Sequence, residues 1–410
     1  MDGRICPMPA GCRALPEQSL DLRPDSEIDL ELLHPKPVTD DKNVWFFWDK
    51  GFERMHPYSQ RTVRTWHRRL SKKGWVVRVI DRVPGSPLNI SAFCDIHDPK
   101  DFPKSFAEET ITGAYAAQIN SDLIRYPLLL KYGGVYADAG MIQIGDLDLI
   151  WDQVIANPES PYEIVAYNCG DVHERVLANY FMMAARSNPV FERCHRLLME
   201  IWAADGGKNS THGMGRSSLI KHAPLKIGHS WSFEEDGKVY SPSDIDEMLA
   251  DYLIQGYVMT LVLGLIDPED GWNGPEYSAK HIYAMDYMVG SQLINEMTAW
   301  NSPKQFRLMS LQMPREGELE SEEQKEAREI VEACLTRSWG FKLAHGLIVR
   351  VLGDTLGTLW KQNPDSDHAP GTYAAWFRYG TLHWVPVDPC PRLDFQVIEP
   401  YKIGPLLREM

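Results

Sequence analysis

Residues 120–140 read NSDLIRYPLLLKYGGVYADAG, and they contain the clearest structural signal in the chain. Apolar side chains recur there and just before at helical spacing, on one stripe: Ile119, Leu123, Tyr126 and Leu130. The pair Gly133-Gly134 is typical of a helix stop, and VYAD at 135–138 is typical of a short buried strand. The stretch therefore predicts a helix, a tight turn and a strand that delivers Asp138 to its carboxyl end.

The segments before this stretch predict a strand, a helix and a second strand. NVWFFWD at 43–49 and WVVRVID at 75–81 are bulky and β-branched, while 59–74 carries apolar residues at helical spacing before Gly74. Strand, helix and strand in this order favour a parallel pair. Together with a further strand at 162–168, the pattern predicts an α/β fold with a mostly parallel sheet flanked by helices.

Three regions differ in character along the chain. Residues 1–42 are rich in proline and acidic groups, so an extended N-terminal arm is expected. Residues 43–270 hold the strand and helix patterns and should form the core. Residues 271–410 should form a mainly helical and irregular extension packed on that core, and residues 240–300 are expected to be mainly helical.

Two helix starts are marked by capping residues. Asn188 and Pro189 open a helix expected at 188–204, and Ser321 with Gln324 forms a capping box for a helix at 321–335.

Composition excludes several classes of protein. The net charge is −15, from 57 acidic and 42 basic residues, which disfavours a large nucleic-acid surface. The most apolar segment, at 253–266, is shorter than the roughly 20 residues that span a bilayer. The seven cysteines are scattered without CxxC pairs, and the N-terminal residues do not resemble a signal peptide. We therefore expect a cytoplasmic protein with no membrane span.

Asp138 is the first candidate for a functional residue. Ligands of open parallel sheets bind beyond the carboxyl ends of the strands, where a carboxylate can hold a divalent cation and, through it, a diphosphate. Asp122 and Arg125 lie three residues apart and so share a helix face. By themselves these two residues are equally compatible with a simple surface ion pair.

At these residues the chain resembles a known group of enzymes. SDLIRYPLLLKYGGVYADAG is similar to the SDxxRxxxLxxxGGxYxDxD signature of glycosyltransferases with a DxD sugar-binding region, and it resembles the capsular-polysaccharide-synthesis family and its fungal members more closely still. VWFFWDKG, WVVRVID and DYLIQGYVMTLVL extend the similarity over roughly residues 40–270. The resemblance implies a GT-A, Rossmann-like fold that binds a nucleotide-diphospho-sugar.

The resemblance also implies roles for particular residues. Arg125 and Asp138 would be catalytic, and the donor would be bound by a larger set: Trp45, Trp48, Asp81, Asp122, Arg125, Gly133, Gly134, Tyr136 and Asp138. The two tryptophans are equally compatible with base stacking and with core packing. His383 would close over the diphosphate, or else it is a structural histidine beside Trp384.

A divalent metal, Mn or Mg, is implied at Asp138. Gly140 stands where the second acid of DxD would be, which leaves the metal requirement open.

The expected activity is transfer of a sugar, from a UDP-sugar, to a hydroxyl acceptor. The acceptor would be a small secondary metabolite or a glycan, and related families, which are hexosyltransferase-like, mostly retain the anomeric configuration. Two alternatives remain: a degenerate GT-A protein that binds nucleotide sugar without transfer, and a GT-A fold recruited for prenyl diphosphate chemistry.

Overall fold

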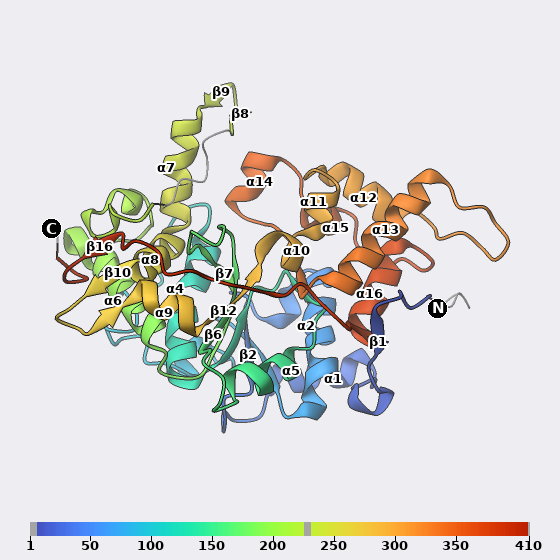
Figure 1. Cartoon of the computed structure of the whole chain (residues 1–410), viewed down its shortest axis with the longest axis horizontal. Helices are drawn as coiled ribbons and strands as arrows, with labels where there is room; N and C mark the ends of the chain where they lie inside the picture. The colour runs from blue at the N-terminus through green and yellow to red at the C-terminus, as the bar shows by residue number, and fades with distance from the viewer. Residues whose placement is uncertain (1–5, 225–230, 409–410) are drawn as a thin grey trace.

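A seven-stranded sheet forms the centre of the molecule (Figure 1). The computed structural model describes residues 6–224 and 231–408. In spatial order the strands are β15 (Arg392–Leu393), β12 (Ile282–Asp286), β6 (Ile164–Asn168), β7 (Leu177–Ala184), β4 (Gly134–Ala137), β2 (Asn43–Phe47) and β3 (Val76–Ile80).

Apolar side chains on both faces of the sheet explain why it is sandwiched between helices. In β2, Trp45 and Phe47 enter one core cluster, while Val44 and Phe46 enter another. The first cluster is closed by α4 (Ala116–Tyr132), α6 (Pro189–Ala203) and α8 (Ile254–Leu263). The second is closed by α1 (Asp25–Leu33), α2 (Pro57–Leu70) and α5 (Leu147–Ile150). The expected α/β class with helices on both faces is confirmed.

The sheet is mixed, so the expectation of a mostly parallel sheet is wrong. Pairs β2–β3, β2–β4 and β6–β12 are parallel, whereas β7 runs antiparallel to both β4 and β6, and β15 runs antiparallel to β12. Strand β7 follows β6 after a connection too short for a crossover helix, and it must therefore return in the opposite direction.

Several other elements agree with their sequence signals. Helix α4 ends at Tyr132 before Gly133, and β4 carries the chain to Asp138. The Asn188 side chain caps α6 by accepting from the backbone N–H groups of Val190 and Phe191. The capping box of Ser321 and Gln324 opens α13 (Glu322–Arg337).

Other regions contain elements that the sequence did not predict. A short helix, α3 (Lys104–Ala107), precedes α4. The N-terminal arm contains α1 and a strand, β1 (Cys12–Ala14), which pairs with β14 (Trp384–Pro386). Residues 240–300 are mainly helical, as expected, but they also contain β10 (Leu265–Asp267), β11 (Trp272–Asn273) and β12. Because β12 belongs to the central sheet, the sheet extends past residue 270.

The C-terminal part forms a second helical layer beside the sheet, with its own core cluster (Figure 1). Its helices are α10 (Tyr287–Ser291), α11 (Leu293–Met297), α12 (Ser302–Ser310), α13, α14 (Leu347–Leu352), α15 (Leu356–Gln362) and α16 (Tyr373–His383), whereas α9 (Gly274–His281) packs against α8 on the other side of the molecule. Its short strand β13 (Gly340–Lys342) pairs antiparallel with β5 (Met141–Gln143), and β16 (Lys402–Ile403) pairs with β10.

Helix α7 (Pro242–Tyr252) and the hairpin of β8 (Phe233–Glu235) and β9 (Lys238–Tyr240) project from the body (Figure 1). A small apolar cluster joins Ile245 and Leu249 of α7 to Leu347 of α14. Among the residues that the structure describes, no helix combines the length and apolar character needed to cross a bilayer.

Candidate active site

A cavity of about 520 Å³ opens beyond the carboxyl ends of β2 and β4. Its walls come from segments far apart in the sequence: the turn after β2, the start of α2, the α4 helix, the turn after β4, and residues 342–361 of the C-terminal part. Ligands of open α/β sheets bind beyond the carboxyl ends of the strands, which is where this cavity lies. The polar residues lining it include Asp49, His56, Ser121, Asp122, Arg125, Asp138, Asn179, Lys342, His345 and Lys361.

Arg125 joins the two carboxylates that the sequence singled out. Its Nη2 atom lies 2.8 Å from Asp122 Oδ1 and 3.1 Å from Asp138 Oδ1. The guanidinium stacks over the Tyr136 ring at 4.7 Å, and the Tyr136 hydroxyl lies 2.5 Å from Ser121 Oγ. Tyr136 is fully buried, and its role in this structure is to hold Arg125 from below.

A second cation, Lys342, reaches Asp138 from the C-terminal part of the chain. Its Nζ lies 3.0 Å from Asp138 Oδ2, so the two oxygens of this carboxylate face two different cations. Strand β13 places Lys342 there, since its pairing with β5 sets Lys342 opposite Met141, three residues after Asp138.

An amide network fixes the other side of Arg125. Its Nη1 donates to the Asn179 carbonyl at 2.9 Å and to Gln255 Oε1 at 3.3 Å. The Asn179 side chain donates to Gln255 at 2.9 Å and to Asp122 Oδ1 at 3.3 Å. These bonds pair the Nη1 atom of the buried guanidinium and orient the group toward the carboxylates.

The two carboxylates differ in acidity although they share Arg125. Burial raises the pKa of Asp122 to about 6, against the attraction of Arg125 and with the repulsion of Asp138. Burial also acts on Asp138, but Lys342 and then Arg125 outweigh it and hold its pKa below the ordinary value. Asp138 is therefore the carboxylate that stays ionised, and Asp122 is the one that titrates near neutrality.

One wall of the pocket is a row of aromatic rings. Trp48 meets His56 edge-on at 5.4 Å, His56 stacks on Tyr58 at 5.9 Å, and Tyr58 stacks on His345 at 6.0 Å. The Tyr58 hydroxyl lies 3.2 Å from His345 Nε2. Burial, and after it the nearby Lys342, lowers the pKa of His345 to about 3, so its imidazole is neutral at physiological pH.

Gly140 leaves room for His345. A Cβ at this position would lie 3.0 Å from the Leu343 carbonyl oxygen and 3.4 Å from His345 Cδ2 and Nε2. A side chain at 140 would therefore press on the segment that carries His345. The position of the missing DxD acid is covered by the C-terminal part of the chain.

The pocket residues do not fit a divalent metal ion. Each oxygen of Asp138 already faces a cation, and Gly140 contributes no ligand atom. Among residues 6–224 and 231–408, the pocket contains no three His, Cys, Asp or Glu ligand atoms close enough to share an ion.

Lys361 and Asp49 are charged pocket residues whose side chains form no ion pair with another described residue, so both can contact a charged or hydroxylated ligand. Lys361 is exposed, and no carboxylate lies in ion-pair distance of it within the part of the chain that the structure describes. Asp49 lies in the turn after β2, on the same wall as Trp48, and its carboxylate likewise faces no cation among the described residues.

Trp48 lines the pocket, but Trp45 does not. Trp45 is fully buried within β2 and its indole N–H donates to the Gly133 carbonyl at 2.9 Å, so it fills the core and is closed to a base.

Gly133 and Gly134 also lie outside the pocket. They precede or begin β4, at the end of the strand opposite Asp138, and a Cβ on Gly134 would overlap the Asn43 carbonyl oxygen. The absence of a side chain at these positions allows the backbone of β2 to approach closely, and no ligand is involved.

Two further residues lie outside the pocket. The Asp81 carboxylate is buried and accepts from the Val83 amide at 2.9 Å and the Ser86 hydroxyl at 2.7 Å, so it closes its own turn. His383 ends α16, and its ring packs on Tyr379 with centroids 4.2 Å apart. The structure thus brings together Trp48, Asp122, Arg125, Tyr136 and Asp138, and leaves Trp45, Asp81, Gly133, Gly134 and His383 apart from them.

Sequence reasoning missed Lys342, His345 and Lys361. The stretch 345–360 resembles a core helix interrupted by glycines, and it forms α14 and α15 on the rim of the pocket. The available signal was chemical: His345 and Lys361 flank that apolar run. Nothing local indicated that Lys342 would meet Asp138, or that His345 would meet Tyr58, 287 positions earlier.

Comparison with known proteins identifies a family and several relatives of the chain. The model of the capsular polysaccharide synthesis protein family matches residues 25–207. The chain is 35% identical to glycosyltransferase afumC of Aspergillus fumigatus, with 86% of this chain and 88% of that one aligned. It is 34% identical to O-glycosyltransferase braB of Annulohypoxylon truncatum, with 92% of this chain and 88% of that one aligned. It is 30% identical to O-glycosyltransferase PaGT of Phomopsis amygdali, with 92% of this chain and 90% of that one aligned.

Among solved structures, the PaToxG glycosyltransferase aligns with a TM-score of 0.26 and 16% identity, over 44% of this chain and 67% of that one, which is too low to assign a fold. The sequence relatives cover nearly the whole chain on both sides of the comparison. The chain therefore belongs to the glycosyltransferases of the capsular polysaccharide synthesis family.

Proposed function

We propose that the pocket transfers a sugar, of the hexose class, from a UDP-sugar to a hydroxyl group of a small-molecule acceptor. The observation that carries the proposal is Asp138, placed between Arg125 and Lys342 at the floor of a cavity of about 520 Å³. Two of the relatives are named O-glycosyltransferases, which supports a hydroxyl acceptor. The proposal includes a GT-A type of fold, supported by the pocket's position at the carboxyl ends of β2 and β4.

Charge neutralisation of the leaving diphosphate is the main chemical task. The sugar C1–O bond to the diphosphate breaks and a C1–O bond to the acceptor forms. In the retaining course that we propose, the acceptor proton passes to a departing phosphate oxygen. Lys342 and Lys361 would face the phosphate oxygens, where fixed cations in a site shielded from water lower the barrier. Asp138 positions Lys342 and Arg125 for this role.

Asp122 and Asp49 suit the hydroxyl groups of the donor. Asp122 lines the pocket beside Arg125, and its side chain is 18% exposed. Its second carboxylate oxygen can therefore accept hydrogen bonds from sugar hydroxyls. Asp49 lies beside Trp48, where a ribose hydroxyl would be bound if the base packs against the Trp48 and His56 rings.

The roof of the pocket suits an apolar acceptor. Tyr252, Leu253 and Val349 contribute to the lining there, next to the small apolar cluster of α7 and α14. An acceptor that combines one reactive hydroxyl with an apolar body would bury that body against these side chains.

We propose further that transfer proceeds with lysine cations in place of a divalent metal. Support comes from the contacts of Asp138 and from the residue at position 140. The proposal also places the enzyme in the cytosol, supported by the free state of all the described cysteines, from Cys6 to Cys390, which a reducing compartment maintains.

The test uses a panel of UDP- and GDP-sugars with the full chain, and follows release of nucleoside diphosphate with and without alcohol acceptors. We expect a UDP-sugar to raise the thermal midpoint and to turn over. Asp138→Asn should lower turnover by about 100-fold or more, whereas the matched surface variant Lys36→Met should not.

Two results would refute the proposal. A thermal shift without turnover, with every acceptor tried, would indicate a protein that binds nucleotide sugar without transfer. A shift with a prenyl diphosphate but with no nucleotide sugar would assign the pocket to other diphosphate chemistry.

A further inference from the structure

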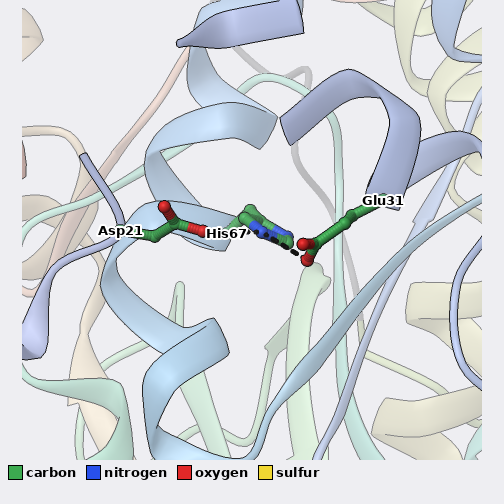
Figure 2. Close-up of side chains that lie close together, drawn as sticks. All are labelled: Asp21, Glu31 and His67. Carbon is green, nitrogen blue, oxygen red and sulfur yellow. Dashed lines mark ion pairs between the residues drawn. The ribbon is translucent and has the colours of Figure 1, made fainter. Parts of the chain in front are cut away.

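A second cluster of ligand-type side chains lies away from the pocket, where the N-terminal arm crosses α2. It consists of Asp21, Glu31 of α1 and His67 of α2, whose ligand atoms all lie within 4.8 Å of one another. Figure 2 shows both carboxylates directed at the imidazole of His67. We refer to these three residues as the arm cluster.

The distances in the arm cluster match those around a bound ion. His67 Nε2 lies 3.5 Å from Asp21 Oδ2 and 3.4 Å from Glu31 Oε2. Two ligand atoms held at about 2.1 Å by one tetrahedral ion lie about 3.4 Å apart. The two distances from His67 thus match this spacing, and the two carboxylates, which come from separate segments, place their ligand oxygens within 4.8 Å of each other.

His67 provides the independent sign that a partner is missing. Its side chain is 7% exposed, and Nε2 makes no hydrogen bond with any residue that the structure describes. A buried imidazole nitrogen without a partner is costly, and such atoms ordinarily have one. The atom points between two carboxylates without the geometry for a hydrogen bond to either.

Arg23 is the other charged group at the arm cluster, and it leaves the ligand atoms accessible. Its Nε donates to Asp21 Oδ1 at 2.9 Å, and its Nη2 contacts Asp21 Oδ2 and lies 2.7 Å from Glu31 Oε1. Glu31 Oε2 and the second lone pair of Asp21 Oδ2 remain for an ion. Because the Arg23 side chain is 43% exposed, it can orient the carboxylates from outside as an outer-sphere group.

The protonation states suit metal binding. The hydrogen bond from Arg23 lowers the pKa of Asp21 to about 2, so this carboxylate is ionised. Burial lowers the pKa of His67, against the opposing effect of Glu31 and Asp21, so its imidazole is neutral. Metal ligands must be deprotonated, and these two are.

We propose that the arm cluster is a binding site for a divalent transition-metal ion of the zinc type. One nitrogen and two carboxylate oxygens are a ligand set that zinc and its neighbours accept. The ion ties the N-terminal arm to α2, whose first turn supplies Tyr58 to the pocket. Its effect is on stability, and it takes no part in sugar transfer.

The experiment is a titration of the EDTA-washed full chain with Co²⁺, followed by its visible absorption, and then displacement by Zn²⁺. We expect about one equivalent per chain. Zinc at about 100 times its dissociation constant should raise the thermal midpoint by about 3 °C.

Variants decide whether the ion is in the arm cluster. Glu31→Gln, on an exposed position of α1, and His67→Gln should each weaken binding by more than about 10-fold. Glu27→Gln, one turn earlier on the same helix, should bind as the wild type does. Asp138→Asn should also keep the ion.

Equal binding by wild type and Glu31→Gln would overturn the proposal, as would absence of the Co²⁺ band in the wild type. Loss of the ion in Asp138→Asn would assign it to the pocket instead. The first two outcomes do not bear on sugar transfer, which is measured separately, whereas an ion in the pocket would also contradict transfer without a metal.

Discussion

Arg125 is shared by two carboxylates, while Lys342 contacts only one of them. This asymmetry separates Asp122 from Asp138 in acidity, and it assigns them different tasks. Asp138 stays ionised and holds two cations in place, whereas Asp122 changes its charge near the working pH. At the scale of single residues, the pocket is therefore a set of charges with one titrating member.

Asp122 should make the stability of the protein depend on pH. Its pKa is about 6 in the folded state, from burial, and about 4 in the unfolded chain. Its contribution to the free energy of unfolding is therefore complete below about pH 4 and is lost as pH rises through 6. Urea titrations of wild type and Asp122→Asn should differ by an amount that changes by about 1–3 kcal/mol between pH 4 and 7.

The direction of that change is the informative part. The stability of the wild type relative to Asp122→Asn should fall as pH rises. A difference that is constant with pH, or that grows with rising pH, would show that Asp122 is not the carboxylate with the raised pKa.

Gly140→Asp restores the second acid of the family motif and should nevertheless harm the enzyme. The new Cβ would meet the Leu343 carbonyl oxygen at 3.0 Å and the His345 ring at 3.4 Å. Overpacking of this kind costs about 1–3 kcal/mol. We expect a lower denaturation midpoint and lower turnover, with no gain on adding Mn²⁺; Gly256→Ala, whose Cβ meets nothing within 4 Å, is the control. Higher turnover with Mn²⁺ would contradict the account.

At the scale of elements, β13 is the decisive segment, because three residues bring the second cation to the pocket. Its pairing with β5 is close-packed at Gly340, where a Cβ would overlap the Met141 side chain and lie 2.8 Å from the Ile142 carbonyl oxygen. Because the Ile142 carbonyl belongs to the backbone of β5, a side chain at position 340 would push β13 away from β5. Lys342 would move with β13.

Gly340→Val should therefore lower both stability and turnover. We expect a loss of about 1–3 kcal/mol in the free energy of unfolding from the overlap. Turnover should fall further than the remaining folded fraction explains, because Lys342 no longer reaches Asp138. Turnover that follows the folded fraction alone would show that β13 is not what positions the cation.

The sequence predicted those helices that have a clear apolar stripe or a capping residue at their start. The stripe from Ile119 to Leu130 and the caps at Asn188 and Ser321 were enough for α4, α6 and α13. Strand β7 was missed because LANYFMMA is buried on both faces and so lacks a two-residue alternation. The sheet direction was wrong for the same reason, since β7 supplies two of the antiparallel pairs.

The candidate site divides in the same way. Asp122, Arg125 and Asp138 lie within 17 residues and share one motif, so the sequence could bring them together. Lys342 and His345 come from about 200 residues later, and only tertiary structure places them. Trp45 and Gly134 were misassigned because an aromatic in a strand and a glycine before it serve packing as readily as binding.

At the scale of the whole molecule, the pocket is closed by parts of the chain that lie outside the region matched by the family model. That region ends at residue 207, whereas Tyr252, Lys342, His345 and Lys361 line the cavity. The N-terminal arm reaches the C-terminal part through β1 and β14 and contacts α2 at the arm cluster. The turns after β2 and β4 supply Asp49 and Asp138, and the later segments supply Lys342, Lys361 and the roof.

Whether Lys342 takes the place of a metal ion is measured by turnover of a UDP-sugar in EDTA and in Mn²⁺, with wild type and with Lys342→Met. With the lysine cation in the place of a metal ion, the wild type should keep most of its rate of nucleoside diphosphate release in EDTA. Lys342→Met should lose about 100-fold or more in kcat under both conditions. A wild-type rate that disappears in EDTA and returns with Mn²⁺, or a Lys342→Met variant as fast as wild type, would contradict it.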